Sequence, residues 1–98
     1  MGPFKQSQMS TEMAELLAVR ALSFIAEDAG RLGHFLAATG LGPTQIREAS
    51  RQPSFLAGVL EYVETDEALL LALAEYSHVD PAAFVQARAA LVTIRGAS

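Results

Sequence analysis

A pattern that recurs after 38 residues constrains the fold of this chain more than any other feature of its sequence. Residues 21–49 align on residues 59–87 without a gap, and five of the 29 positions are identical. The identical positions include an aspartate (Asp28 and Asp66) and a proline (Pro43 and Pro81). Aspartate commonly precedes a helix and proline commonly occupies its first position, so helix starts repeat together with apolar residues. The sequence therefore predicts two similar halves joined in one chain.

Caps, helix breakers and apolar spacing predict six helices, and no segment shows the alternation of a strand. The expected starts are Ser10 or Thr11, Asp28, Gly42-Pro43, Pro53, Asp66 and Asp80-Pro81. Gly40 and His78 follow the second and fifth helices, where a backbone with positive φ is expected. The predicted fold class is all-α, a compact six-helix domain.

The domain is expected to cover residues 10–95, with halves at about 10–51 and 52–95. Residues 1–9 and 96–98 are expected to be tails. A three-helix unit of this size is too small to bury its own apolar face, so the halves are expected to pack on each other.

The apolar spacing also predicts which faces are buried. The first helix carries an apolar stripe of Met13, Leu17, Ala21, Phe24 and Ile25. The fifth helix is apolar almost all round over residues 68–74. A helix that is apolar on every side is normally surrounded, so this helix is expected to lie at the centre of the fold.

Composition excludes several classes of function. The chain has 98 residues, 51% of them hydrophobic, and carries a net charge of −4 with seven lysines and arginines. That charge disfavours nucleic acid as a partner, because contacts with phosphates supply much of the affinity of such complexes. The sequence contains no cysteine and no apolar run near the ~20 residues that span a membrane, so disulfides and a membrane span are not expected. A protein of this kind is most simply cytoplasmic.

No catalytic motif, metal-ligand spacing or phosphate-binding loop is found, so we expect no catalytic residue, metal or cofactor. Acidic residues gather at two equivalent corners, where one expected helix ends and the next begins: Glu27-Asp28 in the first half and the residues near Asp66 in the second. They are explained as helix caps. A weaker alternative treats residues 36–48 as a DNA-binding helix-turn-helix. The large Leu36 at the helix crossing and the acidic chain count against it.

Two other functions stay open. The favoured one is a non-catalytic interaction or adaptor module that binds a protein partner or a second copy through apolar residues outside the main stripes. The residues expected to form that surface are Leu16, Val19, Val85, Arg88, Val92 and Arg95. The alternative is a small-ligand binder or minor enzyme with a pocket between the halves, which would use His34 or His78 and a corner carboxylate.

Residues 35–49 (FLAATGLGPTQIREA) and 55–91 also resemble a family of small bacterial proteins of alphaproteobacterial type, known only as a domain of unknown function. The resemblance covers about residues 11–91 and is most specific over 66–91. It implies a small cytosolic all-helical protein with no assigned activity. The chain departs from the family pattern at His78, where glycine is expected.

Overall fold

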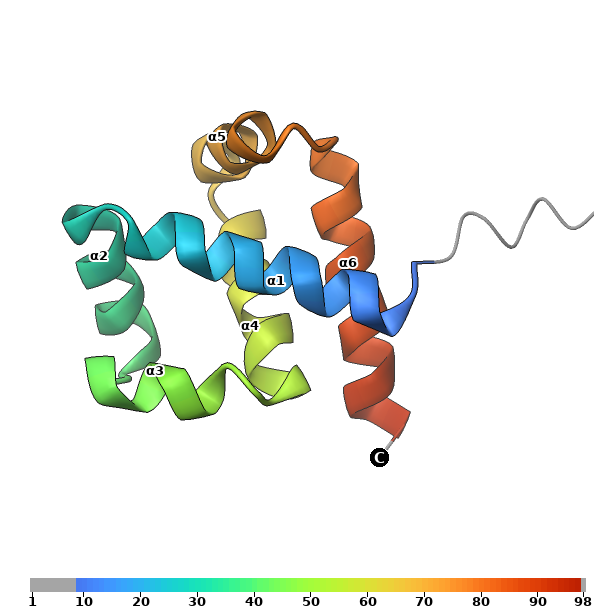
Figure 1. The fold of residues 1–98 in the computed structure, drawn as a ribbon, viewed down its shortest axis with the longest axis horizontal. Helices are drawn as coiled ribbons and strands as arrows, with labels where there is room; N and C mark the ends of the chain where they lie inside the picture. The colour runs from blue at the N-terminus through green and yellow to red at the C-terminus, as the bar shows by residue number, and fades with distance from the viewer. Residues whose placement is uncertain (1–8, 98) are drawn as a thin grey trace, which may run out of the picture.

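The computed structural model describes residues 9–97, and it describes side chains for residues 9–92 apart from Pro43. This part of the chain contains six helices and no strand, as predicted for an all-α fold (Figure 1). The helices are α1 (Thr11–Ala26), α2 (Ala29–Thr39), α3 (Pro43–Ala49), α4 (Pro53–Glu64), α5 (Glu67–Ser77) and α6 (Pro81–Ala97). Of the expected N-terminal tail, residues 1–8 lie outside the described residues, as does Ser98 at the other end. Met9, which was also assigned to that tail, packs against the core.

Side chains and backbone geometry explain where the helices begin and end. The Ser10 hydroxyl accepts a hydrogen bond from the Met13 amide, at 3.1 Å. Asp28 and Asp66 cap α2 and α5 through their carboxylates, and Gly40 and His78 end the same helices with φ of 76° and 56°. These caps confirm the predicted helix starts and ends at equivalent places in both halves. The duplication behind it stays a prediction.

The core lies where α1, α4 and α6 meet. These three helices pack most extensively on one another, and α1 crosses in front of α4 and α6 (Figure 1). Because α1 belongs to the first half and the other two belong to the second, the core joins the halves. Its largest fully buried side chains are Phe35, Phe84, Ile25, Leu60, Leu73, Leu91, Val59 and Val63.

The prediction that α5 lies at the centre is wrong. Leu73 and Ala74 of this helix are buried, but Leu71 is 50% exposed and the helix contacts the core with one side only. Figure 1 shows α5 at the edge of the domain, above α1. An apolar sequence favours burial but does not decide which helices cover one another, and here the longer α1 and α6 occupy the centre.

The burial of Met13 was also predicted wrongly, since its side chain is 46% exposed. The buried face of α1 is centred on Ala14, Ala18 and Ala21, each fully buried. At 100° per residue, Met13 lies about 100° from the middle of that face, where no helix covers it.

Candidate functional site

The outer face of α1 carries a row of exposed apolar side chains. Met13, Leu16 and Val19 are 46%, 52% and 42% exposed, although the opposite side of the same helix is buried. They lie three residues apart, so they follow one another along one face of the helix. Single exposed apolar residues are ordinary on a protein surface, but a contiguous row on a central helix marks a candidate interaction surface. We call these three residues the α1 row.

A groove runs beside the α1 row, between α1 and the segment that joins α3 to α4. Its volume is about 420 Å³. Leu16 and Val19 form one wall with Glu12 and Glu15, while Ser50, Arg51 and Leu56 form the other. The groove therefore has apolar side chains on both walls, with two glutamates on the α1 side and Arg51 on the other, and it can hold apolar side chains of a second protein.

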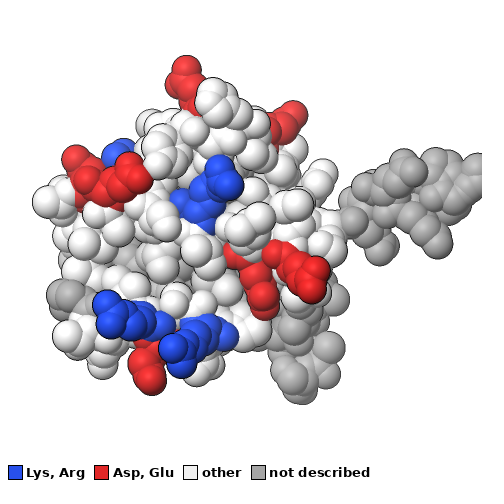
Figure 2. Space-filling view, in the orientation of Figure 1, with Lys and Arg blue, Asp and Glu red and all other residues white. Residues whose placement is uncertain are grey.

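Charged side chains of both signs flank this surface. Glu12 and Arg20 are both exposed on α1, eight residues apart on either side of the α1 row. In Figure 2, acidic groups lie toward the N-terminal part of α1, and basic groups with an acidic group among them lie over α3. The face is mixed in sign, unlike the continuous basic surface that nucleic acid requires.

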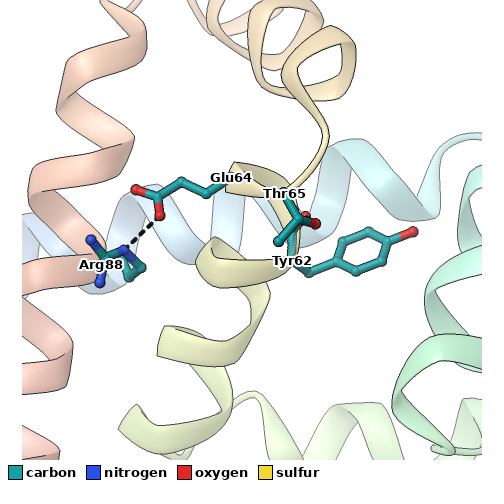
Figure 3. A network of polar contacts seen from close by, with 4 residues as sticks. All are labelled: Tyr62, Glu64, Thr65 and Arg88. Atoms are coloured by element: carbon teal, nitrogen blue, oxygen red, sulfur yellow. Dashed lines mark hydrogen bonds and ion pairs between the residues drawn. The ribbon is translucent and has the colours of Figure 1, made fainter.

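The other residues expected to bind a partner lie on α6, and they are less accessible to a partner than the α1 row. Val85 is 37% exposed, but Val92 is partly buried against the core. The Arg88 guanidinium forms an ion pair with Glu64 at the end of α4, with 2.8 Å between Nε and Oε1 (Figure 3). The side chain of Arg95 lies outside the described residues. Arg88 is thus engaged within the domain.

A hollow of about 320 Å³ separates the corners of the two halves. The first half contributes Ile25, Asp28, Gly30, Arg31 and His34, and the second half contributes Tyr62, Asp66 and Leu69. The structure therefore brings His34 together with both corner aspartates. It leaves His78 elsewhere, at the end of α5, where its backbone closes the helix.

The two aspartates of this hollow are already engaged in capping helices. Asp28 accepts a hydrogen bond from the Arg31 amide at 2.9 Å, and Asp66 accepts one from the Leu69 amide at 3.2 Å. Among the described residues, no group of three or more histidine, aspartate or glutamate side chains is placed to hold a metal ion. The hollow can admit a small polar molecule beside His34, but it presents no assembled nucleophile or acid–base pair.

One cluster that sequence reasoning missed joins the end of α1 to α5. The Tyr76 hydroxyl donates a 2.7 Å hydrogen bond to Oε2 of Glu27, and its ring lies 4.9 Å from that of Phe24. The Arg31 guanidinium lies over the Phe24 ring, 4.1 Å from its centroid. The hydrogen bond with the Glu27 carboxylate raises the pKa of Tyr76 above its ordinary value. Tyr76 is 49 residues from Glu27 in the sequence, and no local pattern signals their contact.

The helix-turn-helix interpretation gains no further support. Helices α2 and α3 are joined at Gly40–Gly42 as the interpretation requires, but α3 has only seven residues. Such a helix is about 10 Å long, short for a recognition helix that reads a major groove. DNA binding stays a prediction that the structure does not test.

No described helix is both long and apolar enough to cross a membrane. Comparison with protein families matches residues 11–93 to the model of a protein family of unknown function, DUF3572. Comparison with the curated proteins found no match, and comparison with the solved structures found none either.

Proposed function

The chain belongs to DUF3572, a family of unknown function, and we propose that it is a non-catalytic module that binds another protein chain through the outer face of α1. The observation that carries this proposal is the α1 row, three exposed apolar side chains on a helix whose other face forms the core. Exposing such a row to water is unfavourable, and a partner that covers it removes that cost.

The groove beside the α1 row strengthens the proposal. A flat apolar patch offers few contacts, whereas a concave surface lets a partner side chain contact several residues at once. Leu16 and Val19 belong both to the row and to the groove. We therefore expect them to contribute most to binding, with Val85 on α6 at the margin. We also propose that the module acts in the cytoplasm of a bacterium, which the resemblance to a family of small bacterial proteins supports.

The test compares two sets of variants in a quantitative pull-down. Leu16→Glu combined with Val19→Glu places two charges in the apolar surface, and we expect it to weaken partner binding at least about tenfold. Leu71→Glu is the matched control, because it adds a charge at an exposed leucine on a different helix, α5, outside the proposed surface. All three positions are exposed, so circular dichroism should show the same helix content for every variant.

The result is decisive in either direction. Loss of a stoichiometric partner with the Leu16/Val19 variant, and its retention with Leu71→Glu, supports binding at the outer face of α1. If the Leu16/Val19 variant retains every interaction of the wild-type chain, the proposed surface is wrong.

The hollow between the halves favours a second candidate function, the binding of a small polar ligand. It unites Arg31 and His34 with the two capping aspartates in a space of about 320 Å³. A thermal-shift screen with metabolites and divalent cations tests this function. We expect any true ligand to raise the melting temperature of the wild-type protein but not that of His34→Ala, whose side chain is exposed and contributes little to stability. A screen without a hit would count against the hollow as a site.

A further inference from the structure

We infer that the hollow between the corners of the two halves binds a free α-amino acid with an apolar side chain. This inference rests on the second candidate function, because it names the class of ligand that the same hollow takes. It is carried by the lining of the hollow, which combines a guanidinium, two carboxylates and an apolar wall. Ligand pockets in proteins usually measure ~300–1,000 Å³, so a hollow of about 320 Å³ suits a very small molecule.

Arg31 provides the positive charge that a carboxylate needs. Its guanidinium lies over the Phe24 ring, and its Nε atom is buried without a hydrogen-bond partner in the part of the chain that the structure describes. Within residues 9–92, Arg31 forms no ion pair with a carboxylate. His34 follows three positions later on the same face of α2 and can hydrogen-bond the same ligand group. A carboxylate bound in the hollow therefore supplies the anion that Arg31 lacks.

The two aspartates provide the negative charge that an ammonium group needs. Asp28 caps α2 through Oδ2, and Asp66 caps α5 through Oδ1. Among the described residues, no group donates a hydrogen bond to the second oxygen of either carboxylate, so each aspartate retains an acceptor. An ammonium group has three donors and no acceptor, and it can therefore bond to these oxygens without disturbing the caps.

The balance of charge around the hollow favours a zwitterion over a simple anion or cation. Asp28 and Asp66 stand at the N-termini of α2 and α5, and each helix N-terminus carries roughly half a positive charge. Together with Arg31, these partial charges roughly offset the two carboxylates. A ligand with a net charge leaves one sign uncompensated, whereas an α-amino acid carries both signs side by side at neutral pH.

Ile25, Tyr62 and Leu69 supply the apolar wall of the hollow. Ile25 belongs to the core, and the Tyr62 ring packs edge-on against Phe35 with 5.1 Å between the ring centroids. Because the core holds these side chains in place, the wall is formed before a ligand arrives. We expect the apolar side chain of the ligand to pack against this wall, and we choose L-leucine as the probe.

Two analogues of leucine, each without one charged group, test the pairing of charges. Isoamylamine lacks the carboxylate, and isocaproate lacks the ammonium group. We expect L-leucine to bind at least about tenfold more tightly than either analogue, because each analogue loses one charge-assisted contact. NMR titration measures the three affinities through the backbone amides of Arg31 and Leu69, which lie at the hollow.

Two variants assign the charged contacts to residues. Arg31→Gln removes the positive charge, and it should weaken binding of leucine and isocaproate at least about tenfold but leave isoamylamine unchanged. Asp66→Asn removes a negative charge and keeps a good helix cap, and it should weaken leucine and isoamylamine but leave isocaproate unchanged. Arg47→Gln and Glu48→Gln are the controls, because they remove the same charges at exposed positions of α3 outside the hollow. Thermal melting checks that each variant remains folded.

Each outcome bears on the inference. Leucine binding that is lost with the carboxylate, with the ammonium group and in both variants supports it. Equal affinities for leucine and isocaproate would overturn it, and the hollow would then be an anion site that still satisfies the second candidate function. If no probe binds but the metabolite screen finds a ligand that His34→Ala loses, the hollow takes another class of ligand and only this inference is wrong. If the screen finds none either, this inference and the second candidate function both fail.

Discussion

Helices α3 and α6, the third helices of the two halves, begin alike and occupy very different places. Each starts at a proline, and a residue with positive φ lies shortly before that proline: Gly40 before Pro43 and His78 before Pro81. Yet α3 has seven residues and leaves Ile46 half-buried at the edge, whereas α6 has 17 residues and buries Phe84 in the core. The start signal thus fixes where a helix begins, but helix length and neighbouring helices decide how much it stabilises the fold.

The largest expected effects come from equivalent residues of these two helices. Phe84→Ala removes a fully buried ring between α6 and the core and should lower the free energy of unfolding by about 3–5 kcal/mol. Ile46→Ala, at the aligned position in α3, should cost only about 1 kcal/mol, because part of that side chain already contacts water. Denaturant unfolding followed by circular dichroism measures both values. Equal losses would show that α3 is as central to stability as α6.

A smaller effect is expected at the capping aspartates, where the halves should behave alike. Asp28 and Asp66 both accept a hydrogen bond from the amide three residues later. Replacing either one with alanine leaves that amide without its partner and should cost about 1 kcal/mol. The same denaturant experiment on Asp28→Ala and Asp66→Ala tests this. A difference well above that value would reveal a further role for one carboxylate in the hollow that both residues line.

Substitutions at the C-terminal ends of α2 and α5 should change stability in opposite directions. Gly40 has φ of 76°, and a Cβ added there would meet no atom within 4 Å, so Gly40→Ala is destabilising only through backbone strain, by about 1 kcal/mol. His78 already bears that strain at φ of 56°. His78→Gly should therefore be neutral or stabilise by a few tenths of a kcal/mol. Thermal melting of both variants decides the matter, and a loss above roughly 1 kcal/mol for His78→Gly would contradict this account.

Local signals in the sequence were sufficient to predict the helices and their ends. Ser10, Asp28 and Asp66 each cap the helix they were expected to cap, and Gly40 and His78 both take positive φ. These features depend on one residue and its near neighbours in the chain, so a sequence contains the information that determines them.

The arrangement of the helices could not be predicted in the same way. The apolar stretch of α5 indicated burial, but Leu71 is exposed because α1 and α6 reach the centre and α5 does not. The α1 row was predicted only in part: Leu16 and Val19 were identified, whereas Met13 was assigned to the core. Such outcomes depend on which helices cover one another, a property of the whole chain rather than of one helical face.

The contact between Tyr76 and Glu27 joins the corner of the first half to α5 of the second, and it should give the smallest effect. Glu27→Gln retains a hydrogen-bond acceptor but removes the charge, so the pKa of Tyr76 should fall toward its ordinary value. A phenol whose pKa is raised on folding contributes stability below its unfolded pKa, near 10, and that contribution is lost as pH rises through the higher folded value. NMR titration of the two tyrosines measures the midpoint of Tyr76 directly, with Tyr62 as an internal reference. An unchanged Tyr76 midpoint in Glu27→Gln would mean that this hydrogen bond does not persist in solution, and that the two halves are joined at this corner by the packing of Tyr76 on Phe24 alone.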